Sequence, residues 1–245
     1  MASRLILHGQ IPEPAMEFLD WLRWGLNNAD RVLTLTLEHL ALSLPAILAS
    51  LVVSVPIAAA ANRIRVLREV IVSGTGLLYA IPSLPLFIVL PIILGTGVRD
   101  TINVIVALTL FGISLMVRSA ADGLAAVPEH VRLAATAQGF SAWRRFLGVD
   151  LPLAGPALLA GLRVVSVSTI SLVSVSAVLG VQSLGSLFTD GFQRSIVGSI
   201  VIGILATALL ALLIDLILVL VGRLLMPWTR MERLSGRAAA RGRGR

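Results

Sequence analysis

The sequence contains no cysteine and no lysine, and few of its residues are charged or aromatic. The absence of cysteine excludes disulfides, thiolate chemistry and cysteine-ligated metal sites. The absence of lysine excludes a lysine Schiff base and the Gly-Lys-Ser/Thr ending of a Walker A phosphate loop. The three histidines, His8, His39 and His130, are far apart and none lies in an H-E-x-x-H pattern, so we expect no metal site.

Apolar residues are what the chain has in abundance. Of its 245 residues, 57% are hydrophobic and 13% are charged, whereas a soluble domain carries roughly 25% charged residues. The mean hydropathy is +0.94. This composition predicts an all-α integral membrane protein in contact with the lipid bilayer. A membrane-embedded enzyme is disfavoured, because no cluster of Asp, His or Glu is visible near a membrane face.

Five segments are long and apolar enough to span a bilayer, which requires about 20 residues each. The second span is the least regular, because Pro82, Pro85 and Pro91 each remove a backbone donor. It is either one broken helix or two short helices, the latter giving six spans or a re-entrant piece. We predict spans at roughly 32–61, 68–95, 101–121, 151–180 and 195–223.

All 20 basic residues are arginine, and their distribution predicts the orientation. Fourteen lie near residues 62–68, in the central loop with its flanks, or in the C-terminal tail, and five lie on the opposite side. The positive-inside rule therefore places the N-terminus outside and the C-terminus in the cytoplasm. The net charge of +7 reflects this topology and not nucleic-acid binding. We divide the chain into an extracytoplasmic amphipathic segment (1–31), a transmembrane domain (32–226) whose central loop is 127–150, and a basic cytoplasmic tail (227–245).

The central loop, "PEHVRLAATAQGFSAWRRFLG" (128–148), is a polar interruption in this apolar chain. Pro128 and Glu129 suit a helix start, and Gly139 interrupts the helix. Ser141 can cap a second short helix that ends by Gly148. The pair is either an ordinary amphipathic element at the interface or a docking element for a partner. Side chains available to such a partner are Phe140, Trp143, Arg144 and Arg145.

Two further groups of residues stand out within the spans. Arg163 and Asp215 are the ionisable residues deepest in apolar sequence, and they either pair with each other or find separate partners. The only tyrosine, Tyr79, precedes Pro82 and Ser83, which break the second span. This break either lines a translocation pathway or gate, or is a kink that packs against a neighbour.

The central loop resembles the "EAA" signature of ABC-importer permeases, which reads Glu-Ala-Ala, three residues, Gly, nine residues and Ile-x-Leu-Pro. The plain departure from it is Leu133, which stands at the position of the glutamate. Four other segments, 38–63, 81–87, 151–163 and 214–218, are similar to osmoprotectant permeases, so that the resemblance covers roughly residues 32–230. The loop positions that match the signature are Ala134, Ala135, Gly139, Val149, Leu151 and Pro152.

The resemblance implies a type I ABC importer permease, with a five-helix core and with or without a sixth short or re-entrant helix. The central loop would be its coupling helix, docked in a cytoplasmic ATPase. The implied substrate is a compatible solute such as glycine betaine, choline or carnitine. A permease for methionine or another amino acid is the nearest alternative, and a non-transport membrane scaffold is the alternative of another class. The loop residues thus assigned to ATPase coupling are Glu129, Ala134, Ala135, Gly139, Phe140, Trp143, Arg144, Arg145, Leu151 and Pro152.

The resemblance also implies the partners and the location. They are a second permease copy or paralogue, two cytoplasmic ATPase subunits and an extracytoplasmic substrate-binding protein, in a bacterial cytoplasmic membrane. The chain itself would hold no cofactor, and ATP and magnesium would bind in the partner ATPase. Because the free energy would come from ATP bound outside the chain, a rigid element must transmit the closing movement of the ATPase subunits to the membrane helices.

Overall fold

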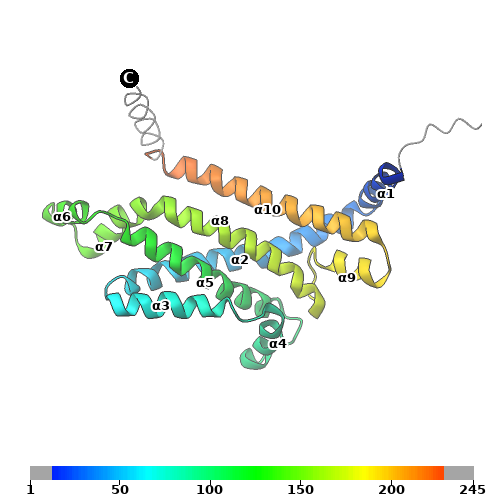
Figure 1. Ribbon diagram of the computed structural model, residues 1–245, viewed down its shortest axis with the longest axis horizontal. Helices are drawn as coiled ribbons and strands as arrows, with labels where there is room; N and C mark the ends of the chain where they lie inside the picture. Colours follow the sequence, from blue (N-terminus) through cyan, green and yellow to red (C-terminus); the bar gives the residue numbers. More distant parts are fainter. Residues whose placement is uncertain (1–12, 229–245) are drawn as a thin grey trace, which may run out of the picture.

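The computed structural model describes residues 13–228, and this part of the chain consists of helices joined by short connections (Figure 1). Four helices are long and apolar enough to cross a membrane. They lie side by side as an elongated bundle, because each offers an apolar surface wider than one neighbour covers. The four are α2 (Ala29–Ala61), α5 (Thr101–Ala125), α8 (Leu151–Ser176) and α10 (Val197–Leu225).

The second predicted span is a bent pair of shorter helices, α3 (Arg65–Leu78) and α4 (Ser83–Leu94). The two helices meet at an angle of 100°. The break follows from Pro82, which has an extended backbone (ψ 134°) immediately before α4 and so cannot continue α3. Counted as one span, the pair brings the total to five, as the sequence predicts.

The core lies where α2, α5 and α8 approach one another through small residues. A Cβ on Gly112 of α5 would lie 2.7 Å from Cβ of Ser50 on α2, and one on Gly161 of α8 would lie 2.5 Å from Cβ of Ser119 on α5. Such close contacts allow dispersion and interhelical hydrogen bonds to hold helices together inside lipid. Ser50 donates to the carbonyl of Thr109 across this contact at 3.2 Å.

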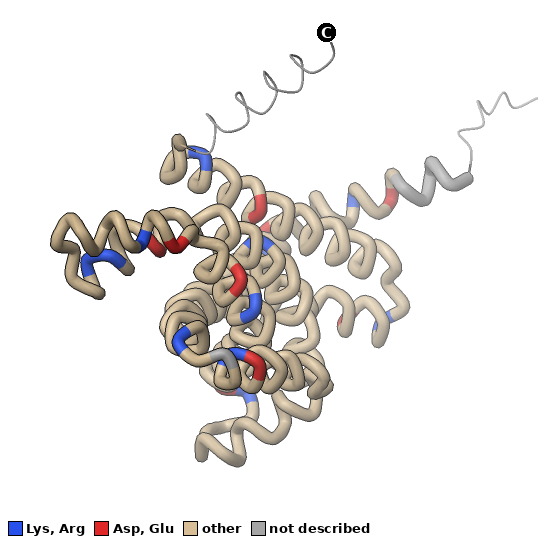
Figure 2. Tube along the Cα trace, turned by 60° about the vertical axis from the view of Figure 1, so that its left-hand side comes forward, with Lys and Arg blue, Asp and Glu red and all other residues tan. Residues whose placement is uncertain are grey.

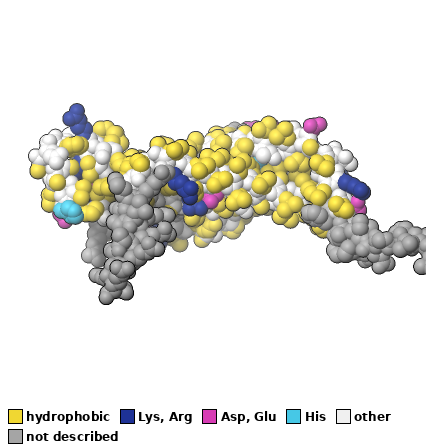
Figure 3. Space-filling view, turned by 90° about the horizontal axis from the view of Figure 1, so that it is seen from above, with side chains coloured by type: hydrophobic (Ala, Val, Ile, Leu, Met, Phe, Trp, Pro, Cys, Tyr) yellow, Lys and Arg dark blue, Asp and Glu magenta, His cyan; other side chains and the backbone are white. Residues whose placement is uncertain are grey.

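Helix α10 packs at the edge of the bundle and keeps most of its apolar surface exposed. Seen from above, hydrophobic side chains cover most of the molecule's face (Figure 3). A continuous apolar face of this size is typical of contact with lipid. The large exposed apolar side chains of α10 include Ile204, Leu205, Leu209, Leu212, Leu213, Leu216, Ile217, Leu220, Leu224 and Leu225.

Shorter helices occupy the two ends of the bundle (Figure 1). The end that carries α6 and α7 also holds the start of α3 and the end of α10, and blue arginine segments gather there in Figure 2. The opposite end carries α1 and α9, and Trp24 of α1 packs close to Gly198 of α10. The short helices are α1 (Glu13–Asn27), α6 (Glu129–Ala137), α7 (Ala142–Arg145), η1 (Phe146–Asp150), η2 (Ala177–Leu179) and α9 (Ser186–Gln193). The predicted basic tail falls almost entirely outside the described residues.

One boundary predicted from the sequence is wrong. The second helix of the central loop does not end by Gly148, because it continues without a break through η1 into α8 as one helix from Ala142 to Leu179. Gly148 lacks the positive φ that ends many helices. The π-helical turn at η1, in which Leu151 N–H bonds to the carbonyl of Phe146, widens the helix where the ring of Pro152 would otherwise clash.

Candidate functional site

The central loop folds as two short helices, and its own residues account for each boundary. Pro128 has an extended backbone (ψ 137°) and precedes α6, which Glu129 begins. Gly139 takes a left-handed φ of 84°, which turns the chain between the helices. The side chain of Ser141 then accepts a hydrogen bond from the backbone N–H of Arg144 at 3.4 Å and caps α7.

The loop presents an apolar face to the space beyond the bundle. Trp143 is 69% exposed and Leu133 is 63% exposed. Phe140 and Leu147 are also exposed, and the Trp143 ring stacks on Phe146 with centroids 6.1 Å apart. Large exposed apolar side chains at the polar end of a membrane protein mark an interaction surface. We call these four residues, Leu133, Phe140, Trp143 and Leu147, the loop face.

The residues beneath and beside the loop face hold it to the bundle. Ala135 is the one buried residue of α6, whereas Ala134 is exposed beside it. Leu151 packs against the core formed by α2, α5 and α8, and Pro152 lies in the first turn of α8. The signature residues therefore divide between the outer surface and the attachment of the loop.

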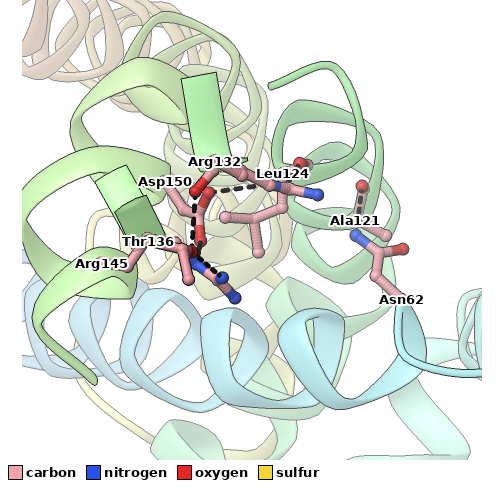
Figure 4. A network of polar contacts seen from close by, with 7 residues as sticks. All are labelled: Asn62, Ala121, Leu124, Arg132, Thr136, Arg145 and Asp150. Carbon is pink, nitrogen blue, oxygen red and sulfur yellow. Dashed lines mark hydrogen bonds and ion pairs between the residues drawn. The ribbon is translucent and has the colours of Figure 1, made fainter. Parts of the chain in front are cut away.

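The two neighbouring arginines of α7 point in different directions. Arg145 turns inward, donates to Oγ1 of Thr136 at 3.1 Å and lies 3.8 Å from a carboxylate oxygen of Asp150 (Figure 4). Arg144 is exposed, and within residues 13–228 its guanidinium makes no ion pair. Of the two arginines assigned to coupling, only Arg144 is placed to meet an acidic group of a partner.

Replacing Gly139 tests whether its role lies in backbone conformation. No atom of the chain lies within 4 Å of a Cβ built there, so the left-handed φ, and not a lack of space, is what disfavours a side chain at this position. Alanine should cost about 1–2 kcal/mol at this conformation, whereas asparagine tolerates it. We expect Gly139→Asn to retain more transport than Gly139→Ala, measured as ATP-driven uptake. The reverse order would show that the partner tolerates no side chain at this position.

The break in the second span lies at half the depth of the bundle. Tyr79 is 49% exposed and packs edge-on against Phe111, with ring centroids 6.2 Å apart. Phe111 is ten residues from one end of α5 and fourteen from the other, so it lies near the middle of the membrane. Beside Tyr79, Pro82 is exposed and Ser83 is half-buried. Non-helical backbone at this depth is tolerated where protein or a water-filled cavity covers it.

The structure brings Arg163 of α8 and Asp215 of α10 together. Nε of Arg163 donates to Oδ1 at 2.6 Å and Nη2 donates to Oδ2 at 2.8 Å, which is the bidentate geometry of a strong ion pair. Each residue is about 15–18 Å along its helix from the end that carries the loop, at 1.5 Å per residue. The pair thus neutralises two charges near the middle of the membrane.

His39 is a structural residue that sequence reasoning missed. It is fully buried on α2, and its Nδ1 accepts a hydrogen bond from the backbone N–H of Leu184 at 3.3 Å. Because that N–H can only donate, the proton is on Nε2, which donates to the carbonyl of Ile170 at 2.9 Å. One imidazole therefore ties α2 to α8 and to the segment before α9. A lone histidine in an apolar run gives no sign of partners more than 100 residues away.

We expect His39→Leu to destabilise the protein by about 1–3 kcal/mol, because the buried N–H of Leu184 loses its acceptor. His130→Leu is the matched control, since His130 is exposed on α6. Thermal unfolding of the purified protein in detergent measures both. Equal unfolding temperatures for the two variants would contradict the structural role of His39.

A polar cavity of about 420 Å³ lies at the end opposite the loop. An ion pair between Arg31 of α2 and Asp190 of α9 forms part of its wall. Arg99, from the connection between α4 and α5, also lines it and makes no ion pair within residues 13–228. The cavity makes this end of the bundle polar and accessible.

An all-helical bundle, a mid-membrane break and a helical loop with an exposed apolar face together define a multi-pass membrane transport component. The chain belongs to the family of binding-protein-dependent transport system inner membrane components, whose model matches residues 47–231. This membership confirms the prediction of an importer permease, and the family is a transport component and not a catalytic one.

The similarity of the chain to known proteins extends over most of its length. The osmoprotectant import permease protein OsmW of Salmonella typhimurium is 29% identical over 82% of this chain and 94% of its own. The glycine betaine/carnitine/choline transport system permease protein OpuCB of Bacillus subtilis is 26% identical over 82% and 91%. An inward-facing structure of the MetNI methionine ABC transporter superposes with a TM-score of 0.65 at 19% identity, over 88% of this chain and 99% of that one. The last match confirms the predicted fold.

Proposed function

We propose that the chain is the permease subunit of an ATP-driven importer that translocates a compatible solute such as glycine betaine, choline or carnitine. The solute would be delivered by an extracytoplasmic binding protein. The loop face is the observation that carries the proposal, because it offers Trp143 and Leu133 to a partner at the arginine-rich end of the bundle. The names of relatives such as OsmW and OpuCB support the substrate class.

The complete transporter would contain two permeases, as two copies of this chain or one copy with a paralogue, and two ATPase subunits that bind ATP and magnesium. The arginine-rich end would face the cytoplasm, which places the N-terminus outside. The polar cavity would then lie at the outer face, on the side of the binding protein. The break at Tyr79, Pro82 and Ser83 would line the pathway, since exposed backbone at mid-depth favours a water-filled or protein-covered surface.

Uptake by reconstituted vesicles tests this proposal. The chain is purified together with an ATPase and a binding protein from its own organism, and labelled glycine betaine, choline, carnitine and methionine are offered with ATP inside the vesicles. We expect accumulation of at least one of the first three. Accumulation of methionine alone would replace the substrate class, and failure of the ATPase to copurify would favour a membrane scaffold without transport.

A further inference from the structure

Asp150 is a nearly buried carboxylate at the junction between the loop and α8. Its residue is 7% exposed, although it lies at the polar end of the bundle. Nε of Arg132 on α6 donates to Oδ1 at 2.8 Å, and Arg145 on α7 lies 3.8 Å from Oδ2. The carboxylate thus faces one guanidinium from each helix of the loop (Figure 4).

The same two arginines extend the network to further backbone and side-chain groups. Arg132 also donates to the carbonyl of Leu124 near the end of α5 at 2.6 Å. Thr136 accepts from Arg145 at 3.1 Å and donates to the carbonyl of Arg132 at 2.9 Å. Asp150 therefore accepts a hydrogen bond from Arg132 and forms a longer ion pair with Arg145, in a network that joins α5, α6, α7 and the start of α8.

Apolar packing contributes little to holding α6 in place. Ala135 is the single buried residue on that helix, and Leu133 points outward. Gly139 separates α6 from α7 and supplies no side chain. The orientation of α6 relative to the membrane helices consequently depends on polar contacts, and the partly buried arginines would lose their counter-charge without Asp150.

We propose that Asp150 is the positioning residue that transmits force from the coupling loop to the membrane helices, an inference that rests on the proposed function. Helix α7 is continuous with α8, so a load on α7 reaches the membrane directly. A load on α6 reaches α8 through Arg132 and Asp150. The pair makes the loop and α8 one rigid body, which is what a mechanical coupling element requires.

The carboxylate also accounts for how the loop functions with Leu133 at the position of the signature's glutamate. Asp150 is not available to the partner, because it is buried, and the exposed carboxylate of this loop is that of Glu129 at the start of α6. The partner's socket should accordingly be apolar, with an acidic group near Arg144. At Leu133 this surface chemistry differs from one that receives a glutamate at the same position.

Asp150→Asn removes the charge with little change of shape and is the central variant. Asp20→Asn is the matched control, because Asp20 forms only an exposed pair with Arg23 at 3.6 Å on α1. Three quantities are measured in reconstituted vesicles: ATPase copurification, ATP hydrolysis, and solute taken up per ATP. A spin label on His130→Cys reports the mobility of α6 without interference, since the chain has no cysteine.

We expect Asp150→Asn to keep the ATPase bound and to lower uptake per ATP about 10-fold, within the range of typical coupling between sites, while the label becomes more mobile. Arg132→Gln should act alike, and the double variant should be no worse than either single one. The inference is overturned by unchanged uptake per ATP, by an immobile label, or by loss of ATPase binding from a folded permease. If Asp150→Asn does not fold, the same three quantities are measured on Arg132→Gln. An unaltered chain that neither binds an ATPase nor transports would contradict the proposed function itself.

Discussion

Trp143→Asp is expected to weaken ATPase binding at least about 30-fold while the permease remains folded in the membrane. Trp143 is the most exposed member of the loop face, and buried tryptophans commonly dominate interfaces. Replacing such an anchor with a charge should cost at least about 2 kcal/mol, or roughly 30-fold in affinity. The measurement is copurification of the ATPase at graded concentrations, combined with ATP-driven uptake.

Two variants control for general effects of this change. Trp143→Phe keeps an aromatic anchor and should retain most of the binding. Phe192→Asp introduces the same charge at an aromatic residue that is 81% exposed on α9, at the other end of the bundle, and should leave ATPase binding unchanged. If Trp143→Asp binds the ATPase as well as Phe192→Asp does, then the loop face is not the docking surface.

Asp215→Leu is expected to reduce the amount of folded protein several-fold. The substitution leaves Arg163 without its bidentate partner in the middle of a spanning helix, where an unpaired charge is expensive. Membrane abundance and monodispersity after extraction measure the effect. Because the pair joins α8 to α10, its removal should lower the amount of folded protein, and this effect is measurable without an assay of transport.

The double variant Arg163→Leu/Asp215→Leu separates structure from function at this pair. Replacing both charges by apolar side chains removes the uncompensated charge, so abundance should recover. Uptake by the recovered protein then shows whether the pair also participates in transport. A single variant as abundant as the unaltered protein would contradict the importance of the pair for folding.

Much of the membrane topology could be predicted from the sequence, because bilayer thickness imposes a length on every spanning helix. The spans coincide closely with α2, α5, α8 and α10. The proline cluster also marked the irregular span, although the 100° angle between α3 and α4 depends on packing against α5. Local chemistry at Pro128, Gly139 and Ser141 was sufficient to place the start of each loop helix and the turn between them.

The features that sequence reasoning missed depend on local helix geometry and on a contact between separate helices, neither of which a residue pattern shows. The prediction that the second loop helix ends by Gly148 is wrong, because the wide turn at η1 carries the helix past Pro152. Asp150 gave no signal, because its partner Arg132 is eighteen residues away and on a separate helix. Arg144 and Arg145 are adjacent in sequence, and only the helical twist of α7 shows that they serve different surfaces.

The central claim is that the loop face docks on an ATPase during transport, and crosslinking from position 143 tests it most directly. A photoreactive aromatic residue replaces Trp143, and the reconstituted transporter is illuminated while it accumulates solute. The account predicts a covalent adduct whose mass is that of the permease plus the ATPase, mapped to the ATPase by mass spectrometry. Adducts with lipid or with the permease alone, in vesicles that still accumulate solute, would contradict it.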